Sequence, residues 1–255
     1  MLGASRWGDA ARMAVGTLTT IRVPAPRVID RRVAGGAMVL APLAAVPLAL
    51  AAGLIVAAGR AVHLPALAVA ALALGAVALG SRGLHLDGLA DTADGLGASY
   101  DRAKALDVMR RGDSGPTGVA TLVFVLLVQV GALTGAVEAG HGIAAAVAGV
   151  LVGRCTLSMS CAEGVPSARP EGLGATVAGS VPKAAAIAVA AAAAGLAALM
   201  PGLPWWRGAA AVALAYLTAG LLLARCTKRL GGITGDVLGA GVETGVAAAL
   251  LALSW

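Results

Sequence analysis

The stretch LPALAVAALALGAVALGSRGLHLDGLADTADG, residues 64–95, changes character in its middle. Residues 64–82 are almost entirely apolar and contain a single charged side chain, Arg82. The following residues place one histidine and three aspartates within ten positions: His85, Asp87, Asp91 and Asp94. A run of about 18–20 apolar residues is long enough to cross a bilayer as a helix. The stretch therefore predicts a membrane helix followed by an acidic segment.

The whole chain has the composition of a membrane protein. Of its 255 residues, 59% are hydrophobic and only 13% are charged, whereas soluble domains contain about 25% charged residues. We therefore predict one all-α domain over residues 1–255, a polytopic integral membrane protein with about seven transmembrane helices. The predicted spans are about 34–58, 64–82, 118–137, 143–162, 184–203, 208–224 and 237–253. Residues 1–33 contain no apolar run typical of a cleaved signal peptide.

The lysines and arginines predict the orientation in the membrane. If the chain has seven spans, nearly all lysines and arginines lie on one side of the membrane, and only Arg60 and Arg207 lie on the other side. Because loops kept in the cytoplasm retain positive charge, the N-terminal segment 1–33 and an acidic loop at 83–117 are predicted to be cytoplasmic. The net charge of +6 then reflects topology and contact with the lipid bilayer, and we expect no nucleic-acid partner.

The three aspartates have the spacing of one helical face. Asp87, Asp91 and Asp94 are separated by four and three residues, so a helix places them on one stripe. Such close anions repel unless they are hydrated or bind a cation. Magnesium prefers oxygen ligands and commonly bridges carboxylates to phosphates. A solvated acidic cap is the alternative, but nearby glycines, which allow a ligand to approach the backbone, favour a metal–phosphate site: Gly83, Gly88, Gly95 and Gly97.

A second acidic cluster lies in KRLGGITGDVLGAGVE, residues 228–243. Asp236 and Glu243 are seven residues apart and therefore share a helical face at the start of the last span. Thr234 is a candidate N-cap, although Thr-Gly-Asp is also an ordinary capping sequence. Lys228 and Arg229 precede this helix start, so these cations and the Thr234 hydroxyl are candidate ligands of a phosphate bound there.

Three further arginines are candidate phosphate ligands. Arg154 falls inside a predicted span, where a guanidinium is costly without a partner. We favour a phosphate or carboxylate partner, with snorkelling or a structural pair with Glu163 as the alternative. Arg22 and Arg110 lie in the predicted cytoplasmic segments.

Together, LHLDGLADTADG and LGGITGDVLGA resemble cobalamin synthase, the adenosylcobinamide-GDP ribazoletransferase family. The similarity extends to TIRVPAP at residues 20–26, to Gly153–Arg154 and to EGLG at residues 171–174. One departure is MRRGDSGPTG at 109–118, where relatives commonly have aspartate at the position of Arg111. Arg110 matches the family there, whereas a ligand role for Asp113 is in doubt.

The resemblance implies a magnesium-dependent enzyme of the bacterial plasma membrane with its active site facing the cytoplasm. Its expected substrates are adenosylcobinamide-GDP and alpha-ribazole or its 5′-phosphate, and GMP is the leaving group. His85 and the three aspartates match the first motif, while Thr234, Asp236 and Glu243 match the second. We infer their individual roles: the metal ligands are expected to be Asp87, Asp91, Asp94, Asp236 and Glu243, and His85 or an unliganded aspartate is expected to accept a proton. The diphosphate would be neutralised by Arg22, Arg154, Lys228 and Arg229.

Two other functions share features with this pattern. CDP-alcohol phosphotransferases use aspartates and a divalent metal, but their spacing, D-G-x-x-A-R followed by G-x-x-x-D-x-x-x-D, is absent. A cation or metabolite transporter would place acids near the membrane midplane, whereas the acids here are predicted to gather at one face.

Overall fold

The computed structural model describes residues 2–254, with side chains from residue 6 onward; Met1 and Trp255, the ends of the predicted domain, lie outside this range. Within it the chain forms helices and no named strand, so the predicted all-α class is confirmed. The helices are α1 (Leu2–Leu18), α2 (Arg31–Ala44), α3 (Val46–Ala61), α4 (Ala66–Gly80), α5 (Leu84–Ala98), α6 (Arg102–Arg111), α7 (Pro116–Glu138), α8 (Gly142–Ser160), α9 (Gly172–Val177), α10 (Lys183–Ala198), α11 (Trp205–Leu230) and α12 (Gly235–Ala252).

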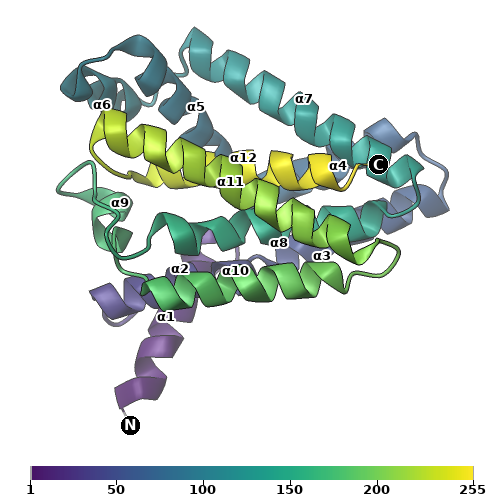
Figure 1. Ribbon diagram of the computed structural model, residues 1–255, viewed down its shortest axis with the longest axis horizontal. Helices are drawn as coiled ribbons and strands as arrows, with labels where there is room; N and C mark the ends of the chain where they lie inside the picture. Colours follow the sequence, from purple (N-terminus) through teal and green to yellow (C-terminus); the bar gives the residue numbers. More distant parts are fainter. Residues whose placement is uncertain (1, 255) are drawn as a thin grey trace.

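The long helices form a bundle with two distinct ends. Figure 1 shows α7, α8, α10, α11 and α12 running roughly along the longest axis, with α6 and α9 gathered at one end and the C-terminus at the other. We call the first of these, which also holds the aspartates of α5, the acidic end. There Arg229 Nη2 donates to Ser99 O at 2.7 Å. At the far end, Arg60 Nη1 donates to Gly140 O at 3.1 Å.

Five helical segments of the described chain are long and apolar enough to cross a membrane: Arg31–Ala61, α7, α8, α11 and α12. The first combines α2 and α3, which Pro47 interrupts near Ala45 because proline lacks a backbone donor. A sixth span exists if α4 and α5 are taken together. Helix α10 is apolar but has only 16 residues. The fold is that of a polytopic membrane protein, but the predicted count of seven spans is not confirmed.

A sharp bend separates α4 from α5. The two axes differ by 89°, and the turn between them contains Arg82 at φ 59° and Gly83 at φ 67°. The Arg82 guanidinium donates to Gly16 O at 2.8 Å, which ties this turn to the end of α1. Because α5 carries three aspartates, we take α4 as the membrane-crossing part and α5 as lying outside it. The segment 83–117, predicted as a loop, thus contains two helices, α5 and α6.

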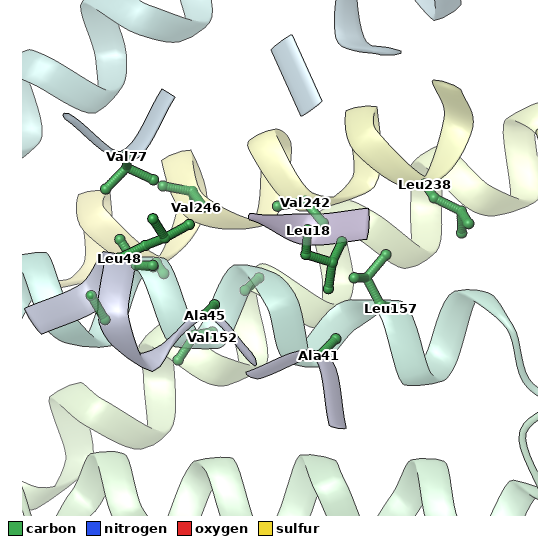
Figure 2. Close-up of a cluster of buried hydrophobic side chains, with 14 of the residues drawn as sticks. Leu18, Ala41, Ala45, Leu48, Val77, Val152, Leu157, Leu238, Val242 and Val246 are labelled. Carbon is green, nitrogen blue, oxygen red and sulfur yellow. The ribbon is translucent and has the colours of Figure 1, made fainter. Parts of the chain in front are cut away.

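Helix α12 is buried along most of its length and organises the core. Small residues let neighbouring helices approach it closely, as is usual in membrane bundles. A Cβ on Gly153 of α8 would lie 2.4 Å from the Val246 side chain, so only glycine fits this crossing. Figure 2 shows the apolar side chains that meet here from α1, α2, α3, α4, α8 and α12 and the residue joining α2 to α3: Leu18, Ala41, Ala45, Leu48, Val77, Val152, Leu157, Leu238, Val242 and Val246.

Candidate active site

A cavity of about 270 Å³ lies at the acidic end, between α5, the segment before α9 and the start of α12. Its polar lining comes from four parts of the chain that are distant in sequence. The polar and charged residues that line it are Thr17, His85, Asp87, Arg169, Glu171, Thr234 and Asp236. The cavity therefore joins the two acidic motifs, LHLDGLADTADG and LGGITGDVLGA.

The contact between α5 and α12 brings these motifs together. A Cβ on Gly88 would lie 2.7 Å from Asp236 O, and one on Gly239 would lie 3.0 Å from the Cα of His85. Glycine is therefore required on both helices for the carboxylates to meet. The prediction that Gly88 gives a ligand access to the backbone is wrong, because Gly88 faces the backbone of α12. Gly95 likewise faces protein, the Met109 side chain of α6.

The carboxylates crowd one another. Burial, together with the charges of Asp87, Asp236 and Asp94, raises the pKa of Asp91 to about 6, and Arg169 offsets only part of this effect. The positive charge of the protein therefore neutralises only part of the negative charge around Asp91, as is expected where a cation binds.

The donor set fits magnesium in an open arrangement. Among residues 2–254 no group of three His, Cys, Asp or Glu side chains is arranged as a ready metal site. Magnesium, however, usually keeps several waters and takes only one or two carboxylates together with substrate phosphates. Asp87 and Asp236, which line the cavity, and Asp91 beside them have the chemistry for such a site.

Asp94 has a structural partner instead. Its Oδ2 accepts a hydrogen bond from Gly115 N at 2.6 Å, and its Oδ1 accepts one from Gly118 N at 2.8 Å. The carboxylate thus satisfies backbone donors at the N-terminus of α7, where negative charge is favourable. Asp94 shares the predicted helix with the other two aspartates but does not line the cavity.

Thr234 is the predicted N-cap of α12. Its hydroxyl oxygen accepts a hydrogen bond from Val237 N at 3.2 Å and donates to Asp236 Oδ2 at 3.1 Å. The cap therefore also fixes the orientation of the Asp236 carboxylate toward the cavity.

Glu243 and Arg154 belong to a buried polar cluster away from the aspartates. Glu243 lies about 10 Å beyond Asp236 along α12, and its Oε2 accepts from Gln129 Nε2 at 2.8 Å. Arg154, 1% exposed, has its Nη2 3.3 Å from His85 Nδ1. Arginine can only donate, so His85 Nδ1 is the acceptor and a neutral His85 carries its proton on Nε2. Neither Glu243 nor Arg154 lines the cavity. Among the described residues Arg154 hydrogen-bonds His85 and Val150 O, rather than Glu163 or the carboxylate that was favoured as its partner.

Most of the predicted basic ligands lie elsewhere. Arg110 Nη2 is 3.7 Å from Glu171 Oε1, which places Arg110 at the cavity rim. Arg229 donates to the end of α5 and stacks on the Tyr100 ring at 4.3 Å. Arg22 and Lys228 are exposed, and neither lines the cavity.

Arg169 was not among the predicted site residues, although among the described residues it is the one lysine or arginine that lines the cavity. Its Nη2 donates to Leu106 O at 2.7 Å, and its Nη1 lies 3.9 Å from Asp236 Oδ2, too far for a hydrogen bond. Its buried Nε has no partner among the described residues. In the sequence Arg169 is one of many arginines in the segments between the predicted spans, although it lies two residues before the EGLG motif at 171–174.

Fold and site together define a helical integral membrane protein with a carboxylate-lined cavity at one end. The sequence profile described as cobalamin-5-phosphate synthase matches residues 10–254. The chain belongs to this family, so the resemblance is confirmed and the protein is an enzyme of cobalamin biosynthesis.

Similar proteins agree with this assignment. A Nocardioides sp. protein is 47% identical over 96% of this chain and 97% of its own length, and one from Frankia casuarinae is 40% identical over 96% and 94%. A Pseudomonas savastanoi protein is 35% identical over 64% of this chain and 66% of its own length. All three are named adenosylcobinamide-GDP ribazoletransferase. No solved structure matches.

Proposed function

We propose that the chain joins adenosylcobinamide-GDP to alpha-ribazole or its 5′-phosphate and releases GMP, with magnesium bound among the carboxylates. The names of the relatives support the reaction. The observation that supports this cavity as the active site is that Asp87, Asp236 and Arg169 line it together, with Asp91 beside them.

In this reaction a ribose hydroxyl of the acceptor attacks the phosphorus nearer the cobinamide. The bond from that phosphorus to the GMP oxygen breaks, and a phosphodiester remains. Phosphoryl transfer depends on positioning and on stabilising negative charge. Bound magnesium would neutralise charge on the diphosphate, and Asp87, Asp91 and Asp236 would hold it.

The remaining polar groups have roles that follow from their hydrogen bonds. Arg169 has unused N–H donors and would bind diphosphate oxygens, because guanidinium pairs well with phosphate. His85 would donate through Nε2, since Nδ1 already accepts from Arg154. The proton of the attacking hydroxyl would go to Glu171, the cavity-lining carboxylate that is not assigned to the metal, rather than to His85.

We also propose that the protein lies in the plasma membrane with the acidic end in the cytoplasm. Nearly all lysines and arginines belong to segments at that end. The exceptions are Arg60 in the last turn of α3, which donates to Gly140 O, and Arg207 at the start of α11. This distribution is typical of a cytoplasmic face.

The test uses detergent-solubilised protein with adenosylcobinamide-GDP, alpha-ribazole and magnesium. The expected products are GMP and a corrinoid with a closed nucleotide loop, and EDTA should abolish both. Asp87→Asn should lower the rate about 100-fold or more, whereas Asp107→Asn, an exposed carboxylate of α6 paired with Arg111, should not. Absence of a closed-loop product from wild-type protein in several detergents would contradict the proposal.

A further inference from the structure

A second cavity, of about 450 Å³, adjoins the acidic one. Thr17 and Leu173 line both, so the two spaces meet at these side chains. The walls of the second cavity are α1, the extended segment 23–29 and α9. We call it the proline cavity, after Pro24 and Pro26 in its lining.

The wall formed by the extended segment is fixed at both ends. Near one end, Asp9, only 4% exposed, accepts hydrogen bonds from Arg27 N at 3.1 Å and from Arg12 Nη1 at 3.2 Å. At the other, Thr20 N donates to Gly80 O at 2.8 Å. The two prolines restrict the backbone between these ties. The proline cavity is therefore preformed, and it gives a structural role to the TIRVPAP motif.

A reaction between two substrates requires room for both at one phosphorus. The acidic cavity, at about 270 Å³, is smaller than the roughly 300–1,000 Å³ of common small-molecule pockets. With a diphosphate placed beside Asp87 and Asp236, an acceptor nucleoside has to reach the phosphorus from an adjoining space. The proline cavity adjoins the acidic cavity at Thr17 and Leu173, so it lies where such a space is needed.

The lining of the proline cavity selects an apolar ring. Much of its lining is apolar, from Met13, Val23, Ile29 and the prolines. Its polar side chains largely hydrogen-bond within the protein. Arg12 is paired with Asp9, and the Thr176 hydroxyl donates to Gly172 O at 3.1 Å. Guanine would leave several donors and acceptors unsatisfied here, which is costly. A benzimidazole base has few such groups.

We propose that the proline cavity binds the aromatic base of the acceptor nucleoside, with the ribose passing Thr17 and Leu173 toward the carboxylates. This inference rests on the proposed function, since it concerns the second substrate of that reaction.

A substitution on α1 that fills the proline cavity tests this proposal. A Cβ on Gly16 would meet only Val23, at 3.4 Å, so the larger side chain of Gly16→Leu extends into the cavity. Gly8→Leu is the matched control, because Gly8 is exposed on the same helix and has open space around it. Gly16→Leu should raise the KM for alpha-ribazole at least tenfold and weaken its binding in equilibrium dialysis to the same degree. The KM for adenosylcobinamide-GDP should stay within twofold of wild type, and Gly8→Leu should change neither.

Thr176→Trp fills the cavity from the opposite wall and should give the same result if Gly16→Leu does not fold. An unchanged acceptor KM in the folded variant would overturn the inference, as would a rise confined to the donor KM, which would assign the cavity to guanine. These two KM outcomes can be observed only if the wild-type protein forms product. If the wild-type protein forms no product, the proposed function itself is contradicted.

Discussion

At the residue scale, the three aspartates of α5 have different surroundings despite their common stripe. Asp87 lines the cavity and Asp91 stands beside it among other carboxylates. Asp94 instead binds the first turn of α7 through both oxygens. Spacing alone makes the three equivalent, and only the position of α7 separates them.

Substitution of these aspartates by asparagine should therefore have two different effects, loss of activity at Asp87 and Asp91 and loss of stability at Asp94. Asp87→Asn and Asp91→Asn should lower kcat about 100-fold or more, because a metal site depends on carboxylate charge, and neither should destabilise the protein in detergent at pH 7. Asp94→Asn should lower the free energy of unfolding by about 1–3 kcal/mol, because one buried N–H of α7 loses its acceptor. Wild-type stability of Asp94→Asn would contradict the capping role.

The raised pKa of Asp91 predicts a pH dependence of stability. Because its folded-state pKa of about 6 exceeds the value of about 3.9 in an unfolded chain, folding takes up a proton between these values. The contribution of Asp91 to stability is present below about pH 4 and is lost as the pH rises through about 6. Without magnesium, Asp91→Asn should therefore gain in unfolding temperature relative to wild type as the pH increases from 4 to 7.

Magnesium supplies the control for this experiment. Metal binding requires the ionised carboxylate, so added magnesium should stabilise wild type more at pH 7 than at pH 5 and should stabilise Asp91→Asn less. An equal magnesium effect at both pH values would show that Asp91 does not take part in binding.

The residues of the site were predictable in part. Asp87, Asp236 and Thr234 carry spacing and capping signals that sequence reasoning can interpret, and the structure brings all three to one cavity. Arg169 carries no such signal, because a lone arginine in a connecting segment has the same appearance as a topological charge. Arg154 shows the converse: its burial was predicted, but its partner His85 lies 69 residues away and depends on tertiary structure.

At the element scale, apolar runs predict where helices occur but not how they turn. Each predicted span contains a helix, because long apolar segments must satisfy their backbone internally in a membrane. The bend before α5 depends on two consecutive positive φ values, and one belongs to an arginine, Arg82, which gives no sequence signal for it. Helices α6 and α9 are short and lie in segments predicted only as connections.

The bend can be tested with a pair of glycine substitutions. Gly83→Ala places a Cβ at φ 67°, which should cost about 1–2 kcal/mol of unfolding free energy. Gly75→Ala in the middle of α4 should instead stabilise by about 0.5–1 kcal/mol. Neither Cβ would meet another atom within 4 Å, so the difference in thermal unfolding reports backbone conformation alone. Equal effects of the two substitutions would argue against a left-handed turn.

At the scale of the whole molecule, the two ends of the bundle carry the charge asymmetry that the sequence predicted. The same asymmetry predicts the labelling of single cysteines introduced into intact cells. Trp205→Cys at the far end should react with an impermeant thiol reagent added outside. Tyr100→Cys and Lys228→Cys, at exposed positions of the acidic end, should react only after permeabilisation. The native cysteines are all buried and should give little background; labelling of Tyr100→Cys from outside would reverse the orientation.

The cavity is built from segments spread over most of the chain, and this has a consequence for biosynthesis. Thr17 and Asp87 leave the ribosome early, Arg169 much later, and Asp236 arrives with the last helix, α12. A nascent chain that has already inserted α7 and α8 still lacks one of the carboxylates and the floor on which Gly88 packs. We therefore expect chemistry to begin only after the final helix has entered the membrane, and a chain released prematurely near residue 230 to be inactive.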